Sequence, residues 1–157
     1  MDKFEEQLSR TRNQLIDEIT SLSYAEFNRK VEVNKWSIAQ VCHHLLITET
    51  LFTKAIMYGL DKQNPTGIER KPIQFVLDRS RKLQAPKISE PSSEPFQVSQ
   101  INEQLCDSRN SLLEVLGKIE DRSILQEIAM KHPVFDDLPL DQWVELLYLH
   151  EQRHIKQ

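Results

Sequence analysis

The sequence predicts an all-α protein, a four-helix bundle with a long crossover between its second and third helices. Only three glycines occur in 157 residues, and strict alternation of apolar and polar residues is not sustained, so sheets are not expected. Apolar residues recur instead at steps of three and four in four separate segments. A bundle buries four such stripes against one another, and we therefore expect this fold.

The first stripe predicts an amphipathic helix of about 20 residues near the N-terminus. Its apolar members are Phe4, Leu8, Leu15, Ile19 and Leu22, and Thr11 fills the gap between Leu8 and Leu15. Residues 23–35 are expected to form a connection. The second helix begins after Ser37, because a serine followed three residues later by Gln40 is typical of a capping box. Its stripe comprises Ile38, Val41, Leu45, Phe52 and Ile56.

Residues 61–97 break the helical pattern and predict an extended crossover. Five prolines fall in this stretch, and only residues 73–84 could form a short helix. The crossover is too short to separate two domains with cores of their own, and helical patterning resumes directly after it. We therefore expect one domain over residues 1–157.

Two further helices complete the predicted bundle. The third opens near Ser99, and Gly117 weakens its end. Its stripe comprises Val98, Ile101, Leu105, Leu112, Leu116 and Ile119. The fourth is expected from about Leu140 or Asp141, because Pro139 stands where a helix start tolerates proline.

Composition argues against several functional classes. The formal net charge is -4 and the basic residues are dispersed, so nucleic acid is not an expected partner. No apolar run approaches the roughly 20 residues of a membrane span, and "MDKFEEQLSR" lacks the pattern of a signal peptide. We expect a soluble, cytoplasmic protein without membrane contact. Cys42 and Cys106 have no metal-binding or redox spacing, and we expect both to be small buried residues.

The last predicted helix carries two histidines on its core-facing side. At 100° per residue, Trp143, His150 and His154 all fall within about 60° of Leu147. Burying an imidazole without a partner costs on the order of 1 to 3 kcal/mol, so something must satisfy both rings. Histidines at positions i and i+4 can aim their nitrogens at one cation, and the alternative is hydrogen bonding to facing side chains or to water.

The same stretch spells the letters H-E-x-x-H of zinc proteases through His150, Glu151 and His154. In those enzymes the third ligand follows the motif, whereas only three residues follow here. We therefore expect the third ligand from upstream. Glu151 remains a candidate general base or a residue that supports a ligand.

Three upstream histidines could supply that ligand. On the second helix His44 lies about 100° from the centre of the apolar stripe at Leu45, whereas His43 lies about 160° away and is expected to point to water. His132 precedes a proline in a connection, where an exposed loop histidine is the simpler expectation. Helix geometry therefore selects His44, together with His150 and His154.

Two motifs resemble those of the DinB/YfiT-like metalloenzymes. "WSIAQVCHHLLITE" (36–49) has a tryptophan and a serine, followed by His44 eight places after the tryptophan. "HPVFDDLPLDQWVELLYLHEQRHIKQ" (132–157) has a loop with a phenylalanine, a helix start with a tryptophan and then H-x-x-R-H-x-x-Q. The neighbouring His43 is a departure that leaves a second candidate on that helix. The order of helices fits the family over nearly the whole chain.

The resemblance implies a four-helix bundle of the DinB kind, usually a homodimer, with a divalent metal ion held by residues corresponding to His44, His150 and His154. We expect zinc or nickel, although three imidazoles also suit copper and iron. Members of the family include transferases that use a low-molecular-weight thiol as cosubstrate, such as bacillithiol or mycothiol. Others are presumed to be hydrolases.

We therefore predict a metal-dependent enzyme acting on a small-molecule substrate, in the first place a thiol-dependent S-transferase. One alternative is a metal-dependent hydrolase that uses metal-bound water. Another is a non-catalytic helical stress protein whose metal only braces the bundle. A bound metal ion would lower the pKa of a thiol or of water, so both reactions use the same physics.

Overall fold

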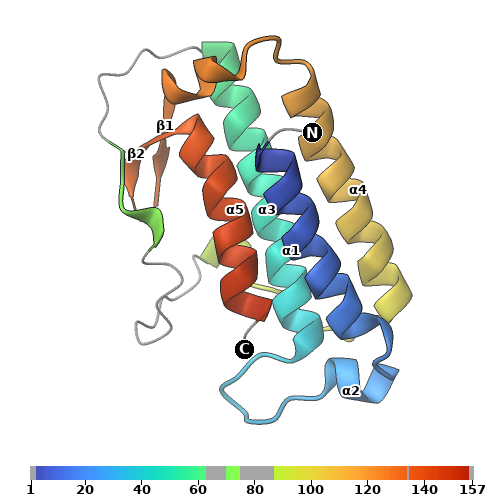
Figure 1. Ribbon diagram of the computed structural model, residues 1–157. Coiled ribbons are helices and arrows are strands. Elements are labelled where there is room, and N and C mark those ends of the chain that lie inside the picture. The colour runs from blue at the N-terminus through green and yellow to red at the C-terminus, as the bar shows by residue number, and fades with distance from the viewer. Residues whose placement is uncertain (1–2, 63–69, 75–86, 134, 156–157) are drawn as a thin grey trace.

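The computed structural model describes residues 3–62, 70–74, 87–133 and 135–155. Four long helices lie side by side, which confirms the predicted four-helix bundle (Figure 1). In chain order, the described elements are α1 (Lys3–Thr20), α2 (Tyr24–Asn28), α3 (Ile38–Lys62), the 3-10 helix η2 (Lys87–Ser89), α4 (Val98–Gly117), the 3-10 helix η3 (Arg122–Gln126), β1 (Ala129–His132), β2 (Asp136–Pro139) and α5 (Leu140–Ile155).

The long crossover between α3 and α4 sets the directions of the helices. Following the colours of Figure 1, α1 and α5 run one way and α3 and α4 run the other. Because α3 and α4 are parallel, the chain between them must return along the whole length of the bundle. The short helix expected at residues 73–84 lies almost wholly outside the described residues.

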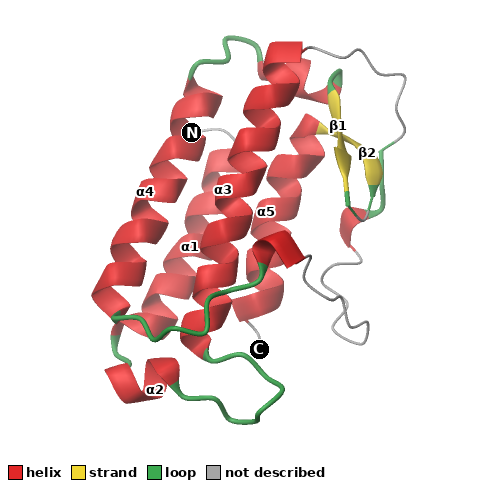
Figure 2. Cartoon of the chain, turned by 180° about the vertical axis from the view of Figure 1, so that it is seen from behind, coloured by secondary structure: helices red, strands yellow, loops and turns green. Residues whose placement is uncertain are grey.

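Capping explains where two of the helices begin. The predicted box opens α3: the Gln40 backbone N–H donates to Ser37 Oγ at 3.0 Å, and the Ser37 N–H donates to Gln40 Oε1 at 2.9 Å. A second box, between Ser23 and Glu26, opens α2 within the segment expected to be a plain connection. Figure 2 shows α2 at the end of the bundle where α1 stops and α3 starts.

A two-stranded hairpin departs from the prediction that sheets are absent. Strands β1 and β2 pair antiparallel, with Ala129 opposite Pro139 and His132 opposite Asp136. The indole N–H of Trp143 donates to the Leu138 carbonyl at 3.1 Å, which ties the hairpin to α5. Each strand has only four residues, too few for the alternation that predicts a strand from sequence.

The core consists of two apolar clusters with charged side chains between them. The first cluster packs around Trp143 and includes Leu8 of α1 and Leu112 of α4. The second includes Leu15 of α1 and Leu105 of α4. Along each long helix, a charged residue stands between the parts that enter the two clusters. These four residues, which we call the polar layer, are Arg12, Glu49, Arg109 and Glu151.

The two cysteines differ in burial, and one expectation was wrong. Cys42 is buried in the second cluster, whereas Cys106 is exposed on α4. Cys106 directly follows a core leucine, so helical periodicity places its side chain on the solvent-facing side of α4.

Each described helix is too short or too polar to span a bilayer.

Candidate metal centre

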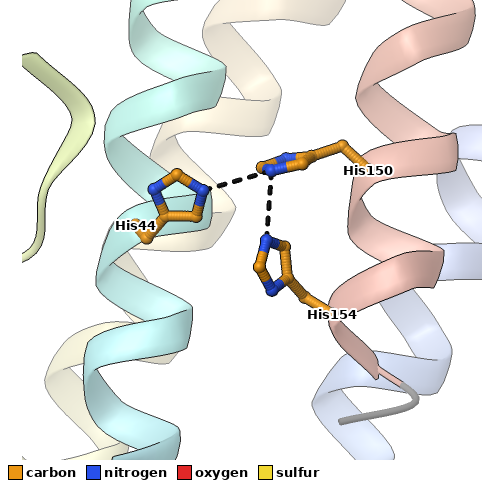
Figure 3. Close-up of side chains that lie close together, drawn as sticks. All are labelled: His44, His150 and His154. Carbon is orange, nitrogen blue, oxygen red and sulfur yellow. Dashed lines mark hydrogen bonds between the residues drawn. The ribbon is translucent and has the colours of Figure 1, made fainter. Parts of the chain in front are cut away.

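Three histidines from two helices converge at one point between α3 and α5 (Figure 3). His44 comes from α3, while His150 and His154 lie one turn apart on α5. The Nε2 atom of His150 lies 3.1 Å from Nε2 of His44 and 3.1 Å from Nε2 of His154. The potential ligand atoms of the three residues all lie within 4.8 Å of one another. The structure thus brings together the three residues selected by helix geometry.

A backbone carbonyl fixes the tautomer of His44. Its Nδ1 lies 2.8 Å from the carbonyl oxygen of Ser89 in η2. A carbonyl can only accept, so Nδ1 carries the proton and donates it. In a neutral imidazole the other nitrogen then has a free lone pair, and on His44 that nitrogen is Nε2, which faces His150. The crossover between α3 and α4 therefore orients this ring toward the other two histidines.

Burial keeps two of the rings neutral. His44 is only 3% exposed, and burial lowers its pKa below the ordinary histidine value. The pKa of His150 is lowered well below that value, chiefly by burial and further by the neighbouring His154 and His44. Trp36 covers His44, with ring centroids 5.0 Å apart. Neutral imidazoles are the form that binds metal ions.

The donor set fits a divalent transition metal. Because His44 Nε2 has no proton, its contact with His150 is a hydrogen bond only if His150 Nε2 carries one. That same proton would then have to serve the contact with His154. A cation could accept lone pairs from all three nitrogens. Two imidazole ligands of a tetrahedral zinc ion lie about 3.3 Å apart, close to the 3.1 Å of the two short pairs.

A family model described as the DinB superfamily matches residues 7–157 of this chain. The chain belongs to the DinB superfamily. It is 29% identical, over 141 residues, to the uncharacterized protein YuaE of Bacillus subtilis (strain 168), an alignment that covers 90% of this chain and 86% of YuaE. Among solved structures it is similar to TT2238, described as a four-helix bundle protein, with a TM-score of 0.67 and 16% identity. That match covers 99% of this chain and 94% of TT2238.

In this DinB-superfamily chain Glu151 belongs to the polar layer. Its Oε1 accepts from Arg12 Nε at 2.7 Å, and its Oε2 accepts from Arg109 Nη2 and Thr11 Oγ1, each at 3.2 Å. The side chain of Glu151 is 3% exposed. Both carboxylate oxygens thus accept hydrogen bonds from side chains of α1 and α4. The glutamate within H-E-x-x-H therefore joins α5 to these two helices in the interior of the bundle.

The polar layer joins all four long helices of the DinB-superfamily bundle. Glu49 of α3 accepts from Arg12 Nη2 at 3.1 Å and from Arg109 Nε at 2.9 Å. Each arginine also donates to a backbone carbonyl, Arg12 to Leu105 at 2.8 Å and Arg109 to Leu8 at 2.7 Å. Arg109 stands between Leu105 and Leu112 in the apolar stripe of α4, and its bonds to the two buried carboxylates explain why a charged residue lies there.

His43 lies outside the cluster, and its predicted exposure was wrong. The ring is half-buried, its Nδ1 accepts from the Ser92 backbone N–H at 2.9 Å, and it packs on Phe96 with centroids 4.8 Å apart. These contacts hold the crossover against α3. The prediction failed because the crossover covers a face of α3 that would otherwise point to water.

His132 was expected in an exposed loop, and this expectation was also wrong. The residue ends β1 and is only 8% exposed. Its ring packs on Trp143 and Phe52, with centroids 4.9 and 5.7 Å away. Burial lowers the pKa of His132 to about 4. The unpredicted hairpin turns this side chain inward, against α3 and α5.

Proposed function

We propose that this chain is a metal-dependent enzyme whose divalent ion, zinc or nickel, is held by His44, His150 and His154. The observation that carries this proposal is the convergence of three Nε2 atoms from α3 and α5, with the tautomer of His44 set by Ser89. Membership of the DinB superfamily supports it. A bound ion would act as a Lewis acid and lower the pKa of a coordinated thiol or water.

Three protein ligands favour a catalytic site over a structural one. Structural zinc sites normally have four protein ligands, whereas catalytic sites keep a position for a substrate. Among the residues that the structure describes, no carboxylate or cysteine joins the three histidines. We therefore infer a position on the ion for an exogenous ligand.

We propose a thiol as that ligand, and S-transfer as the reaction. Hydrolysis requires a base to remove a proton from water, and Glu151, the carboxylate adjacent to His150, is bound by two arginines. A free thiol has a pKa of about 8.5, so a modest shift makes the thiolate available near neutral pH. The thiol proton would pass to solvent, the sulfur would form a bond to an electrophilic carbon, and the leaving group would depart with the bonding electron pair.

Metal analysis of the purified protein tests the site. We expect one divalent ion per chain in the wild type and loss of that ion in His150→Ala and His154→Ala. His43→Ala is the matched control, because its ring neighbours His44 in sequence and packs on Phe96 outside the cluster. Retention of the metal by all three variants would refute the three-histidine centre.

Conjugation assays test the reaction. Wild-type protein loaded with zinc or nickel should accelerate thioether formation between a small thiol, such as bacillithiol or cysteine, and a chlorinated aromatic electrophile. His154→Ala should not. If the loaded protein cleaves esters or amides instead, the hydrolase alternative holds, and if it does neither, the metal braces the bundle. The homodimer, the small-molecule substrate, the single domain and the cytoplasmic location remain predictions.

A further inference from the structure

A buried hydroxyl in α3 lacks the hydrogen-bond partner that a buried polar group normally has. Thr48 is 7% exposed, and its Oγ1 has no hydrogen-bond partner among the described residues. Other threonines of the same helix bond back to the carbonyl four residues earlier: Thr50 donates to Leu46 at 3.0 Å and Thr53 to Glu49 at 2.8 Å. Leaving a buried hydroxyl unpaired costs free energy, so the Thr48 hydroxyl calls for a partner beyond the described residues.

The position of Thr48 links it to the candidate metal centre. It follows His44 by four residues and precedes Phe52 by four, so the three residues lie on one face of α3. That face meets α5 at both ends. The His44 ring lies 4.9 Å from the His150 ring, and the Phe52 ring lies 4.8 Å from Trp143.

Thr48 therefore lies between two different groups of side chains. One turn toward the N-terminus of α3 is the cluster of three imidazoles, and one turn toward its C-terminus is an aromatic wall formed by Phe52, His132 and Trp143. These three rings carry no charge near pH 7: the indole N–H of Trp143 donates to the Leu138 carbonyl, and the lowered pKa of His132 keeps that ring neutral. On the face of α3 that runs through His44, Thr48 and Phe52, the Thr48 hydroxyl lies one helical turn from His44.

We propose that Thr48 is a further ligand-binding residue, whose Oγ1 donates a hydrogen bond to the exogenous group held at the His44–His150–His154 centre. The ligand class is a small anion or a thiol bound as its thiolate, because an anionic acceptor gains most from a hydroxyl donor in a water-poor site. This proposal rests on the proposed metal centre and adds a contact that distinguishes one ligand from another.

The first test needs no metal. Thr48→Val replaces the hydroxyl by a methyl group of similar size, and it should raise the melting temperature of the metal-free protein because an unpaired buried group is removed. Thr53→Val is the matched control, a buried threonine of the same helix with a satisfied hydroxyl, and it should lower the melting temperature. If both variants are destabilised alike, Thr48 has an internal partner and the proposal fails.

The second test measures ligand affinity on protein loaded with cobalt(II), by the change in visible absorption on titration with azide and with 2-mercaptoethanol. We expect Thr48→Val to bind both about tenfold more weakly than the wild type, and Thr48→Ser and Thr53→Val to stay within about twofold. Affinity for cobalt itself should be unchanged in all three variants. Equal ligand affinity of Thr48→Val and the wild type would overturn the role of Thr48 alone, whereas failure of the wild type to bind cobalt would overturn the metal centre as well.

Discussion

Arg12 on α1 and Glu151 on α5 are joined by a hydrogen bond of 2.7 Å in the interior of the bundle, 139 positions apart in sequence. Glu151 directly follows His150, so the contact ties the helix that carries two of the three clustered histidines to the first helix. A buried ion pair of this kind is costly to break, because the remaining charge is left without its partner.

We predict that Glu151→Gln destabilises the protein by about 3–5 kcal/mol, since it leaves Arg12 and Arg109 with one carboxylate between them. This corresponds to a fall in melting temperature on the order of 10 °C for a chain of this size. Glu6→Gln, which removes an exposed pair with Arg10, is the control and should change stability by less than about 0.5 kcal/mol. Thermal unfolding followed by circular dichroism measures both, and similar melting temperatures for the two variants would contradict the prediction.

The tautomer of His44 can be observed directly. We predict that in metal-free protein the ring carries its proton on Nδ1, because that atom donates to the Ser89 carbonyl at 2.8 Å. Long-range ¹H–¹⁵N correlation spectra distinguish the two ring nitrogens. Free histidine serves as the reference, and a protonated Nε2 on His44 would show that the Ser89 contact does not orient the ring.

The buried His132 should make stability depend on pH. Its pKa is about 4 in the folded protein, below the ordinary value of 6.5, so the folded state resists protonation. The contribution of the neutral His132 ring to the free energy of unfolding is fully present above pH 6.5 and is lost as the pH falls toward 4. Between pH 7 and pH 4.5 this loss amounts to about 2 kcal/mol.

We therefore predict that His132→Phe, which keeps an aromatic ring against Phe52 and Trp143, loses less stability than the wild type over that range. Urea unfolding of both metal-free proteins at the two pH values measures the difference, and groups common to both cancel. An equal loss in the two proteins would show that His132 is protonated without cost.

The two cysteines should differ in reactivity. Cys106 is exposed, whereas Cys42 is fully buried and burial raises its pKa to about 12. We predict that a thiol reagent such as Ellman's reagent modifies one cysteine of the folded protein rapidly and the other only on unfolding. Cys106→Ala should abolish the rapid phase. A rapid phase that persists in this variant would mean that Cys42 is accessible.

The helices and the histidine cluster could be predicted because both follow from periodicity. Steps of three and four residues located the long helices, and the angle of 100° per residue separated His44 from His43. The capping pattern at Ser37 placed the start of α3 at its observed position. These signals are local in sequence, and tertiary packing preserved them.

The errors concern residues whose surroundings are set by distant segments. The hairpin that buries His132 has strands too short to leave an alternating pattern, and the crossover that covers His43 meets α3 only in the folded chain. Glu151 was a candidate general base or a residue that supports a ligand, and nothing in its own helix indicates the two arginines that reach it from α1 and α4. Local periodicity does not encode such contacts.

The polar layer also fixes the depth at which the helices lie against one another. If α5 slid by one turn, about 5.4 Å, an apolar side chain would replace the Glu151 carboxylate opposite Arg12 and Arg109. Glu151 is next to His150, and Glu49 follows His44 by five residues, so a charge held in place also holds its neighbouring imidazole in place. The two arginines thereby fix the axial register of α3 and α5, and this register keeps His44 and His150 opposite each other across the bundle.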